Sequence, residues 1–430
     1  MTADPMSGDQ ACCEEFARTS RARIGRRGFL KTAALGGAAT VTAVHGTAFT
    51  STAYAASGSA DRVLVVLSMR GACDGLSLVV PHGDPVYYAA RPSISVPATR
   101  LLAKDGFFGL HPALAPLLPW WTNGTMAAVQ ATGLPVPNRS HFSAMEEVED
   151  ADPGSDARVG WLNRLIGRNG TGSPIEAIQY GGGVPVAAVS GPQPVLVTPD
   201  ADSVTLSAAD TPSAAAKRRA SMTTMWGGVP GPLATGARTA LDVVEAFAPV
   251  RNGSKTPANG ASYPGNSDLA RALASTARTI RADVGAEVIT VDHGSWDHHT
   301  WIGQPDNGNM RRMADEFAGS LAAFLTDLGP LASKVTVVTL SEFGRRVKEN
   351  ASQGLDHGYG NVMFLVGAGV KGGRYYGTWP GLTNTTDADL LVTTDYRSVL
   401  SEVVTSGFGA STASVFPGFS PQRIGVMQGA

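Results

Sequence analysis

Four short, largely apolar runs stand out in the hydrophobic pattern of this chain. They lie at residues 61–67, 286–291, 334–340 and 362–367. A continuous apolar run of this length is typical of a strand buried on both faces of a parallel sheet, because such a strand has no solvent-facing side. Each run is followed or preceded by a segment rich in glycine and acidic residues, which is typical of a loop.

Helical patterns fit between these runs. Apolar residues recur at helical spacing over residues 309–328, residues 112–121 predict a shorter helix, and residues 143–149 open with the Ser-x-x-Glu pattern of a capping box at Ser143 and Glu146. Alternation of strand, loop and helix predicts an α/β domain with a mainly parallel central sheet.

Residues 207–265 differ from the rest in being rich in Ser, Ala, Thr, Pro and Gly, with a small basic group at Lys217, Arg218 and Arg219. This composition indicates a low-complexity insertion or lid region and not a separate domain. We therefore expect one domain over residues 56–430 that carries this insertion.

The first 55 residues have the layout of an export signal. Arg26 and Arg27 precede Phe29, a weakly apolar stretch covers residues 32–50, and Ala53-Tyr54-Ala55 fits a small-x-small cleavage site. The paired arginines resemble a twin-arginine signal, which predicts engagement of the twin-arginine export machinery, cleavage near Ala55 and a periplasmic or extracellular location. The alternative is a transmembrane anchor, but the apolar stretch is short and glycine-rich for a span of about 20 residues.

Composition and charge exclude several classes of protein. Apolar residues make up 43% and charged residues 16% of the chain, so it is not disordered throughout. The formal net charge of −2 argues against nucleic acid as the main partner. Cys73 is the one cysteine left after signal removal, so disulfides do not hold the exported protein together, and the mature chain has no apolar segment long enough to span a membrane.

Acidic residues and histidines gather beside the predicted strands. They are Asp74, Asp292 and His293, Asp297 to His299, Glu342, and Asp356 and His357. Ligands of open α/β sheets bind outside the carboxyl ends of the strands, so we expect these groups to form one metal site. Taken singly, each could instead be a turn residue, a helix cap or an exposed loop residue. Carboxylates combined with imidazoles suit zinc, manganese or iron better than calcium.

Ser140 is the candidate nucleophile. It directly precedes a predicted helix, whose first amide groups favour an anion or a developing alkoxide. The alternative is that Ser140 acts only as the helix N-cap. The chain has no Gly-x-Ser-x-Gly elbow and no Walker-type phosphate loop.

Several motifs together resemble the family called domain of unknown function 1501, made of exported bacterial proteins that are placed in the alkaline-phosphatase and sulfatase-like superfamily. The motifs run in order between about residues 62 and 400, and lie at residues 70–76, 106–114, 138–142, 160–163, 296–299, 341–345 and 356–361. The resemblance implies an alkaline-phosphatase-like three-layer sandwich, with helices on both faces of a mainly parallel central sheet.

The resemblance also implies a site of one or two divalent metal ions with a nucleophile at a helix start. Zinc is the first expectation, with manganese, iron or calcium as alternatives. Ser140 stands at the position of the nucleophile. The metal ligands that it implies are Asp74, Asp297, His299, Glu342, Asp356 and His357. Phe343 stands where the superfamily commonly has a histidine after the acidic residue, so one imidazole is missing.

We therefore expect an exported, metal-dependent hydrolase of small-molecule or polymer-borne phosphate or sulfate esters, in which Arg139 or Arg345 holds the oxyanion. The missing imidazole after Glu342 keeps open a second function, that of a non-catalytic binding or assembly protein with the same fold. A third is a metal-free Ser/His/Asp hydrolase.

Overall fold

A computed structural model of the chain describes residues 59–168, 172–206, 211–265 and 267–429. The predicted signal peptide at residues 1–55 lies outside the described residues. Within the described part of the chain, no helix combines the length and the apolar character needed to cross a bilayer.

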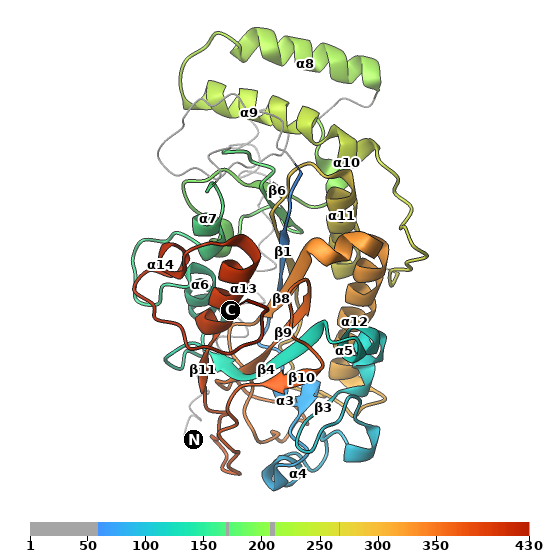
Figure 1. The fold of residues 1–430 in the computed structure, drawn as a ribbon, viewed down its shortest axis with the longest axis vertical. Helices are drawn as coiled ribbons and strands as arrows, with labels where there is room; N and C mark the ends of the chain where they lie inside the picture. The colour runs from blue at the N-terminus through green and yellow to red at the C-terminus, as the bar shows by residue number, and fades with distance from the viewer. Residues whose placement is uncertain (1–58, 169–171, 207–210, 266, 430) are drawn as a thin grey trace, which may run out of the picture.

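A nine-stranded sheet runs through the middle of the domain, in the order β10-β4-β9-β8-β1-β7-β5-β6, with β11 beside β4 (Figure 1). The four predicted strands are confirmed as β1, β7, β8 and β9, whereas β4, β5 and β6 were not predicted. The bounds are β1 Val63–Met69, β4 Met126–Gly133, β5 Ala177–Tyr180, β6 Leu196–Thr198, β7 Val288–His293, β8 Val335–Leu340, β9 Asn361–Gly367, β10 Arg374–Tyr376 and β11 Thr394–Asp395.

The sheet is mainly parallel, as predicted. Strands β8, β1, β7, β5 and β6 all run in one direction, whereas β9 runs antiparallel to both of its neighbours, β8 and β4. The amino end of β9 therefore lies at the same edge as the carboxyl ends of β1, β7 and β8. This places the segment before β9 beside the segments that follow the other three strands.

Helices cover both faces of the sheet, which confirms the three-layer arrangement (Figure 1). Val63, Val65 and Leu67 of β1 pack into one core with α11 (Asp268–Ala282) and α12 (Gly308–Leu328). Leu64 and Val66, which point to the opposite face, pack into a second core with α6 (His141–Asp150) and α13 (Tyr396–Phe408). Alternation of side chains along a strand explains why β1 is apolar throughout.

Of the three predicted helices, α12 begins within one residue of its predicted start. The other two differ from expectation. The segment after His111 forms a 3-10 helix, η2 (Pro112–Leu117), and then a short α5 (Leu118–Thr122), because Pro116 lacks the N–H that a continuous α-helix needs. α6 begins at His141 with Ser140 as N-cap residue, three residues before the predicted capping box.

The segment predicted as a low-complexity insertion contains three helices, α8 (Pro212–Trp226), α9 (Pro232–Ala246) and α10 (Ala248–Asn252). Alanine is the strongest helix former, and the Thr211 side chain caps α8 by accepting a hydrogen bond from the Ala214 N–H. α8 and α9 lie at the top of Figure 1, at the end of the molecule opposite to α3 (Gly75–Leu78), the first helix after β1.

Short elements complete the chain. They are α3 Gly75–Leu78, β2 Val79–Val80, α4 Pro85–Ala90, η1 Ala98–Arg100, β3 Gly109–Leu110, α7 Trp161–Leu165, η3 Ala187–Val189, η4 Ala201–Ser203, η5 Gly329–Lys334 and α14 Thr412–Val415.

Candidate metal centre

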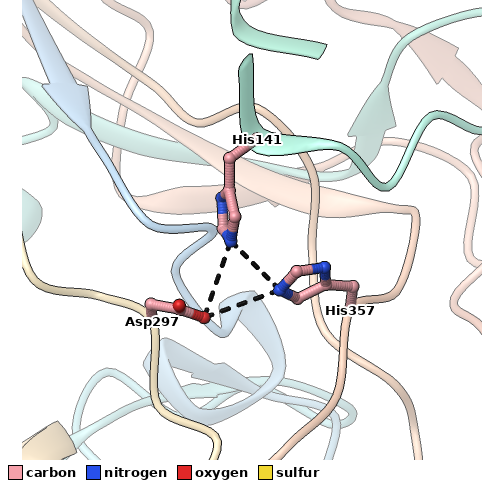
Figure 2. A group of neighbouring side chains, drawn as sticks. All are labelled: His141, Asp297 and His357. Atoms are coloured by element: carbon pink, nitrogen blue, oxygen red, sulfur yellow. Dashed lines mark hydrogen bonds and ion pairs between the residues drawn. The ribbon is translucent and has the colours of Figure 1, made fainter. Parts of the chain in front are cut away.

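Three side chains from distant parts of the sequence converge at the strand edge described above. His141 is the first residue of α6, Asp297 lies on the loop after β7, and His357 lies on the loop before β9. One ligand atom from each lies within 4.8 Å of the other two (Figure 2). We call these three residues the candidate centre.

The spacing of the three ligand atoms matches that of ligands on one metal ion. The two Nε2 atoms of His141 and His357 are 3.0 Å apart, and each lies 3.6 Å from Oδ1 of Asp297. Ligands held about 2.1 Å from a tetrahedral ion lie about 3.4 Å from one another. Two imidazoles and one carboxylate also form a donor set that zinc, manganese and iron accept. The residues present therefore fit a divalent transition metal.

Hydrogen bonds on the far side of both rings aim the Nε2 atoms at the centre. Nδ1 of His141 lies 2.8 Å from Oε1 of Glu342, and Nδ1 of His357 lies 3.0 Å from the carbonyl oxygen of Arg139. A carboxylate and a carbonyl accept hydrogen bonds, so each Nδ1 carries the proton. In the neutral rings the two Nε2 lone pairs then face each other, and either a proton or a cation has to lie between them. Metal-binding histidines are oriented in this way.

Glu342, which the sequence predicted as a ligand, lies behind His141. Its Oε1 also accepts a hydrogen bond from the Gly71 N–H at 2.8 Å, and its Oε2 accepts one from the Ser341 hydroxyl at 3.1 Å. Burial would raise the pKa of Glu342, but the contact with His141 lowers it below the usual value. Glu342 is thus an ionised carboxylate that orients an imidazole.

Asp297 is held as an anion. Burial would raise its pKa, but its contacts with the surrounding imidazoles and the charge of Arg345 lower it far below the usual value. The Arg345 guanidinium lies 2.5 Å from Oδ1 of Asp297 and is itself buried, donating to the carbonyl oxygens of Gly71, Ala72 and Leu355. Arg345 therefore has a fixed position beside the candidate centre.

His299 and Asp356, both predicted ligands, lie next to the candidate centre. The Nε2 atom of His299 is 3.0 Å from Nε2 of His357 and 3.0 Å from Oδ1 of Asp297. Nδ1 of His299 faces Oδ1 of Asp356 at 3.4 Å, and Asp356 also accepts a hydrogen bond from Asn350. Asp356 thus contacts the ring of His299 from outside, in the same way that Glu342 contacts His141.

Asp74 lies apart from the candidate centre in a buried ion pair. Its two oxygens accept hydrogen bonds from the Arg91 guanidinium at 2.6 and 3.0 Å, and both side chains are at most 1% exposed. Burial would raise the pKa of Asp74, but the charge of Arg91 lowers it below the usual value. The structure therefore pairs Asp74 with an arginine and does not bring it into the group of three.

Ser140 and Arg139 flank the candidate centre through the backbone. Ser140 is the N-cap residue of α6, but its side chain makes no capping hydrogen bond, so its hydroxyl is not used to cap the helix. The Arg139 guanidinium forms an ion pair with Asp389, and its carbonyl oxygen holds His357. Arg139 therefore acts on the centre through its main chain, whereas the sequence predicted its side chain as an oxyanion contact.

The sequence did not single out His141 as a candidate ligand. It lies in the motif at residues 138–142, in which Ser140 is the predicted nucleophile. The absence of a histidine after Glu342 was the available signal, because the structure supplies an imidazole at that carboxylate from α6.

The comparisons with known proteins agree with the family suggested by the motifs. The sequence matches the family described as "Protein of unknown function (DUF1501)" over residues 115–403. No curated protein matches it. Two of the solved structures that are similar to it are PsFucS1 sulfatase from Pseudoalteromonas sp., with a TM-score of 0.35 and 12% identity over 84% of this chain and 70% of that one, and alkaline phosphatase from the Antarctic bacterium TAB5, with a TM-score of 0.29 and 10% identity over 74% and 95%. At these scores the likeness assigns no activity to this chain.

Proposed function

The chain belongs to the DUF1501 family of proteins of unknown function, and we propose that it is a metal-dependent hydrolase of phosphate or sulfate esters with Ser140 as nucleophile. The observation that supports this best is the convergence of His141, Asp297 and His357, with both rings held so that Nε2 faces the centre. A histidine with a purely structural role does not require the Nε2 atom of a second imidazole to face its own Nε2 atom.

His141, Asp297 and His357 would hold the ion, and His299 lies close enough to join them. A divalent cation supplies positive charge for the oxygens of a phosphoryl or sulfuryl group and lowers the pKa of a hydroxyl bound to it. Arg345 keeps its guanidinium fixed at the edge of the centre, and the start of α6 presents amide groups to an anion.

The reaction needs two displacements. In the first, the Ser140 hydroxyl loses its proton and forms a bond to phosphorus or sulfur, while the bond to the ester oxygen breaks and the alcohol leaves with a proton. In the second, water attacks the same atom, the bond to Oγ breaks, and phosphate or sulfate is released with the serine hydroxyl restored. The substrate is thus a small-molecule or polymer-borne ester.

Residues 1–55 extend the proposal to the location of the protein. We infer that the twin-arginine machinery exports the folded chain and that cleavage occurs near Ala55. Export in the folded state would allow the centre to load zinc, manganese or iron beforehand. Detection of the processed chain outside the cytoplasm, and its retention inside after replacement of Arg26 and Arg27 by lysine, would support this inference.

A metal assay combined with an ester screen tests the main proposal. The purified protein is stripped with a chelator, reloaded with zinc or manganese, and its metal content is measured by plasma mass spectrometry. Hydrolysis of 4-nitrophenyl phosphate and 4-nitrophenyl sulfate is then followed. We expect activity in the loaded protein and loss of it after stripping; activity that survives stripping would favour a metal-free Ser/His/Asp hydrolase.

Single substitutions separate the roles of the residues. Asp297→Ala and His357→Ala each lower the bound metal, whereas Ser140→Ala keeps the metal and abolishes turnover. Ser221→Ala, at an exposed position of α8, serves as the matched control and leaves both unchanged. Unchanged metal content in both ligand variants would reject the centre, and normal rates in Ser140→Ala would reduce Ser140 to an N-cap.

The second candidate function is that of a non-catalytic binding protein. It is favoured by the Arg345 guanidinium, which already neutralises Asp297, and by Phe343, which stands where the superfamily has a ligand. Fully metal-loaded protein that hydrolyses neither ester class would support this function.

A further inference from the structure

The two helices α8 and α9 form a hairpin at the end of the molecule opposite to α3 (Figure 1). We use the term hairpin for residues 211–246. In α8 a single residue, Met222, is buried, so the helix packs on α9 and leaves most of its surface in solvent. A helix with so little burial contributes little to the stability of the core, which suggests that its surface has another use.

The end of the hairpin presents large apolar side chains to solvent. Met225 in the last turn of α8 is 58% exposed, Val229 in the connecting turn is 42% exposed, and Leu233 in the first turn of α9 is 68% exposed. We call these three residues the tip. Exposed apolar residues that gather on one turn mark an interaction site more often than singly scattered ones.

The turn that carries the tip is held from the inside. The Arg238 guanidinium donates hydrogen bonds to the carbonyl oxygens of Trp226 at 2.7 Å and Val229 at 2.9 Å, and to the hydroxyl of Thr235 at 3.1 Å. These bonds satisfy main-chain acceptors at the carboxyl end of α8. The turn therefore keeps its shape while its apolar side chains point outward.

The charge of the hairpin is opposite in sign to that of the rest of the chain. Its four basic residues are Lys217, Arg218, Arg219 and Arg238, and its two acidic residues are Asp242 and Glu245, near the far end of α9. Its net charge is therefore +2, and because the whole chain carries −2, the remaining residues carry −4. Lys217 and Met225 are eight residues apart and so lie on one side of α8.

We propose that the hairpin docks this protein on an anionic lipid membrane, with the tip inserted among the lipids and the exposed Lys217 of the positively charged hairpin facing the headgroups. Apolar side chains beside basic residues are the combination that binds such surfaces. A second copy of the chain is disfavoured as the occupant because two hairpins of the same charge would repel each other. Nucleic acid is disfavoured because phosphate binding makes no use of an apolar tip.

This orientation leaves the candidate centre free. The hairpin lies at one end of the molecule, whereas α3 lies toward the other end (Figure 1). The loop that carries Asp297 packs against Gly71, in the segment that joins β1 to α3, so the centre lies on the α3 side. A membrane bound at the hairpin would leave the centre facing the aqueous phase. The inference does not depend on the proposed hydrolase activity, since membrane binding is measured without substrate.

Tryptophan quenching by brominated lipids reports on the hairpin directly. The chain has seven tryptophans, and Trp226, next to Met225, is the one that lies in the hairpin. Residues 1–58 contain no tryptophan, so binding through the N-terminal segment does not mimic the signal. We expect brominated phosphatidylglycerol vesicles to quench the full-length chain, and Trp226→Phe to lose most of the quenching. Equal quenching in Trp226→Phe would overturn the proposal.

A triple variant, Met225→Ser with Val229→Ser and Leu233→Ser, tests the tip. We expect its partitioning to phosphatidylglycerol vesicles to weaken by at least about tenfold in Trp226-dependent quenching. Val184→Ser with Leu391→Ser is the matched control, because these residues are 77% and 59% exposed but lie outside the hairpin. Unchanged partitioning of the triple variant would overturn the proposal, as would equal quenching by neutral phosphatidylcholine.

A second copy of the chain or a nucleic acid as the binding partner of the hairpin would each give a different experimental result. A dimer of the wild-type chain that the triple variant disrupts, seen by light scattering without vesicles, would assign the tip to a second copy. Tight binding of a single-stranded oligonucleotide that the triple variant retains, without quenching by vesicles, would assign the basic residues to nucleic acid. Either result would overturn membrane docking.

Discussion

The candidate centre and the hairpin differ in whether their charged side chains are buried or exposed. In and around the candidate centre, on the side of the molecule where α3 follows β1, ionised side chains are buried and bound to fixed partners, as Glu342 is to His141 and Asp74 is to Arg91. In the hairpin, ion pairs such as Arg219 with Glu245 lie in solvent, and apolar residues are exposed. Burial makes a misplaced charge costly, so the centre has one arrangement, whereas the hairpin surface remains free for contacts.

The largest expected effect comes from breaking the buried ion pair. Arg91→Met leaves the Asp74 carboxylate buried without its partner, and we expect a loss of about 3–5 kcal/mol in the free energy of unfolding, measured by urea titration. Arg219→Met removes an ion pair whose side chains are 35% and 69% exposed, and we expect a change of about 0–1 kcal/mol. Equal losses in both variants would abolish the contrast between the two regions.

Substitutions of apolar residues test the same contrast between a buried region and the exposed hairpin. Leu67 in β1 is fully buried, and Leu67→Ala should cost about 2–5 kcal/mol through lost burial and the cavity left behind. Leu233→Ala at the tip removes a side chain that is 68% exposed, and we expect a change within about 0.5 kcal/mol. A loss at Leu233 as large as that at Leu67 would show that the tip is covered in solution.

Glu342→Gln tests the orienting role of a carboxylate beside the candidate centre. Without a charged acceptor for His141, we expect metal affinity to fall about 10- to 100-fold, measured by competition with a chelator. Glu245→Gln in the hairpin should leave metal affinity at the wild-type value. If Glu342 were a direct ligand, the loss would instead match that of Asp297→Ala.

The smallest effect concerns the pH dependence of stability. The pKa of Asp74 is lowered in the folded protein, so its ionised form stabilises the fold fully above the unfolded pKa of about 3.9, and this contribution is lost as pH falls through the lower folded pKa. We expect the free energy of unfolding of the wild type to decrease below about pH 4 and to decrease less steeply in Asp74→Asn. Asp268→Asn, where the side chain is 92% exposed, should match the wild-type slope.

Much of the framework could be predicted because it depends on local pattern. The four apolar runs became β1, β7, β8 and β9, and the helical spacing gave α12 almost to the residue. Asp297, His299, Glu342, Asp356 and His357 were expected near one sheet edge, and the structure brings all five to it. Strand ends collect ligand residues whatever their exact partners, which explains this success.

Other features depend on contacts between distant residues. The reversed direction of β9 placed the segment before it, and not after it, at the site. Asp74 was expected as a ligand, but no local pattern reveals that Arg91 pairs with it. The helices at residues 212–252 were not predicted, because the composition of this segment resembles that of a low-complexity region.

The sequence by itself determined the layered α/β architecture and the chemical nature of the donors, because periodicity and residue type are written along the chain. Only the tertiary structure decided that His141 joins Asp297 and His357, that Glu342 lies behind His141, and that Asp74 is neutralised by Arg91. The physical reason is that the partner of a buried polar group is chosen by three-dimensional packing, which brings together residues as far apart in the sequence as His141 and Glu342.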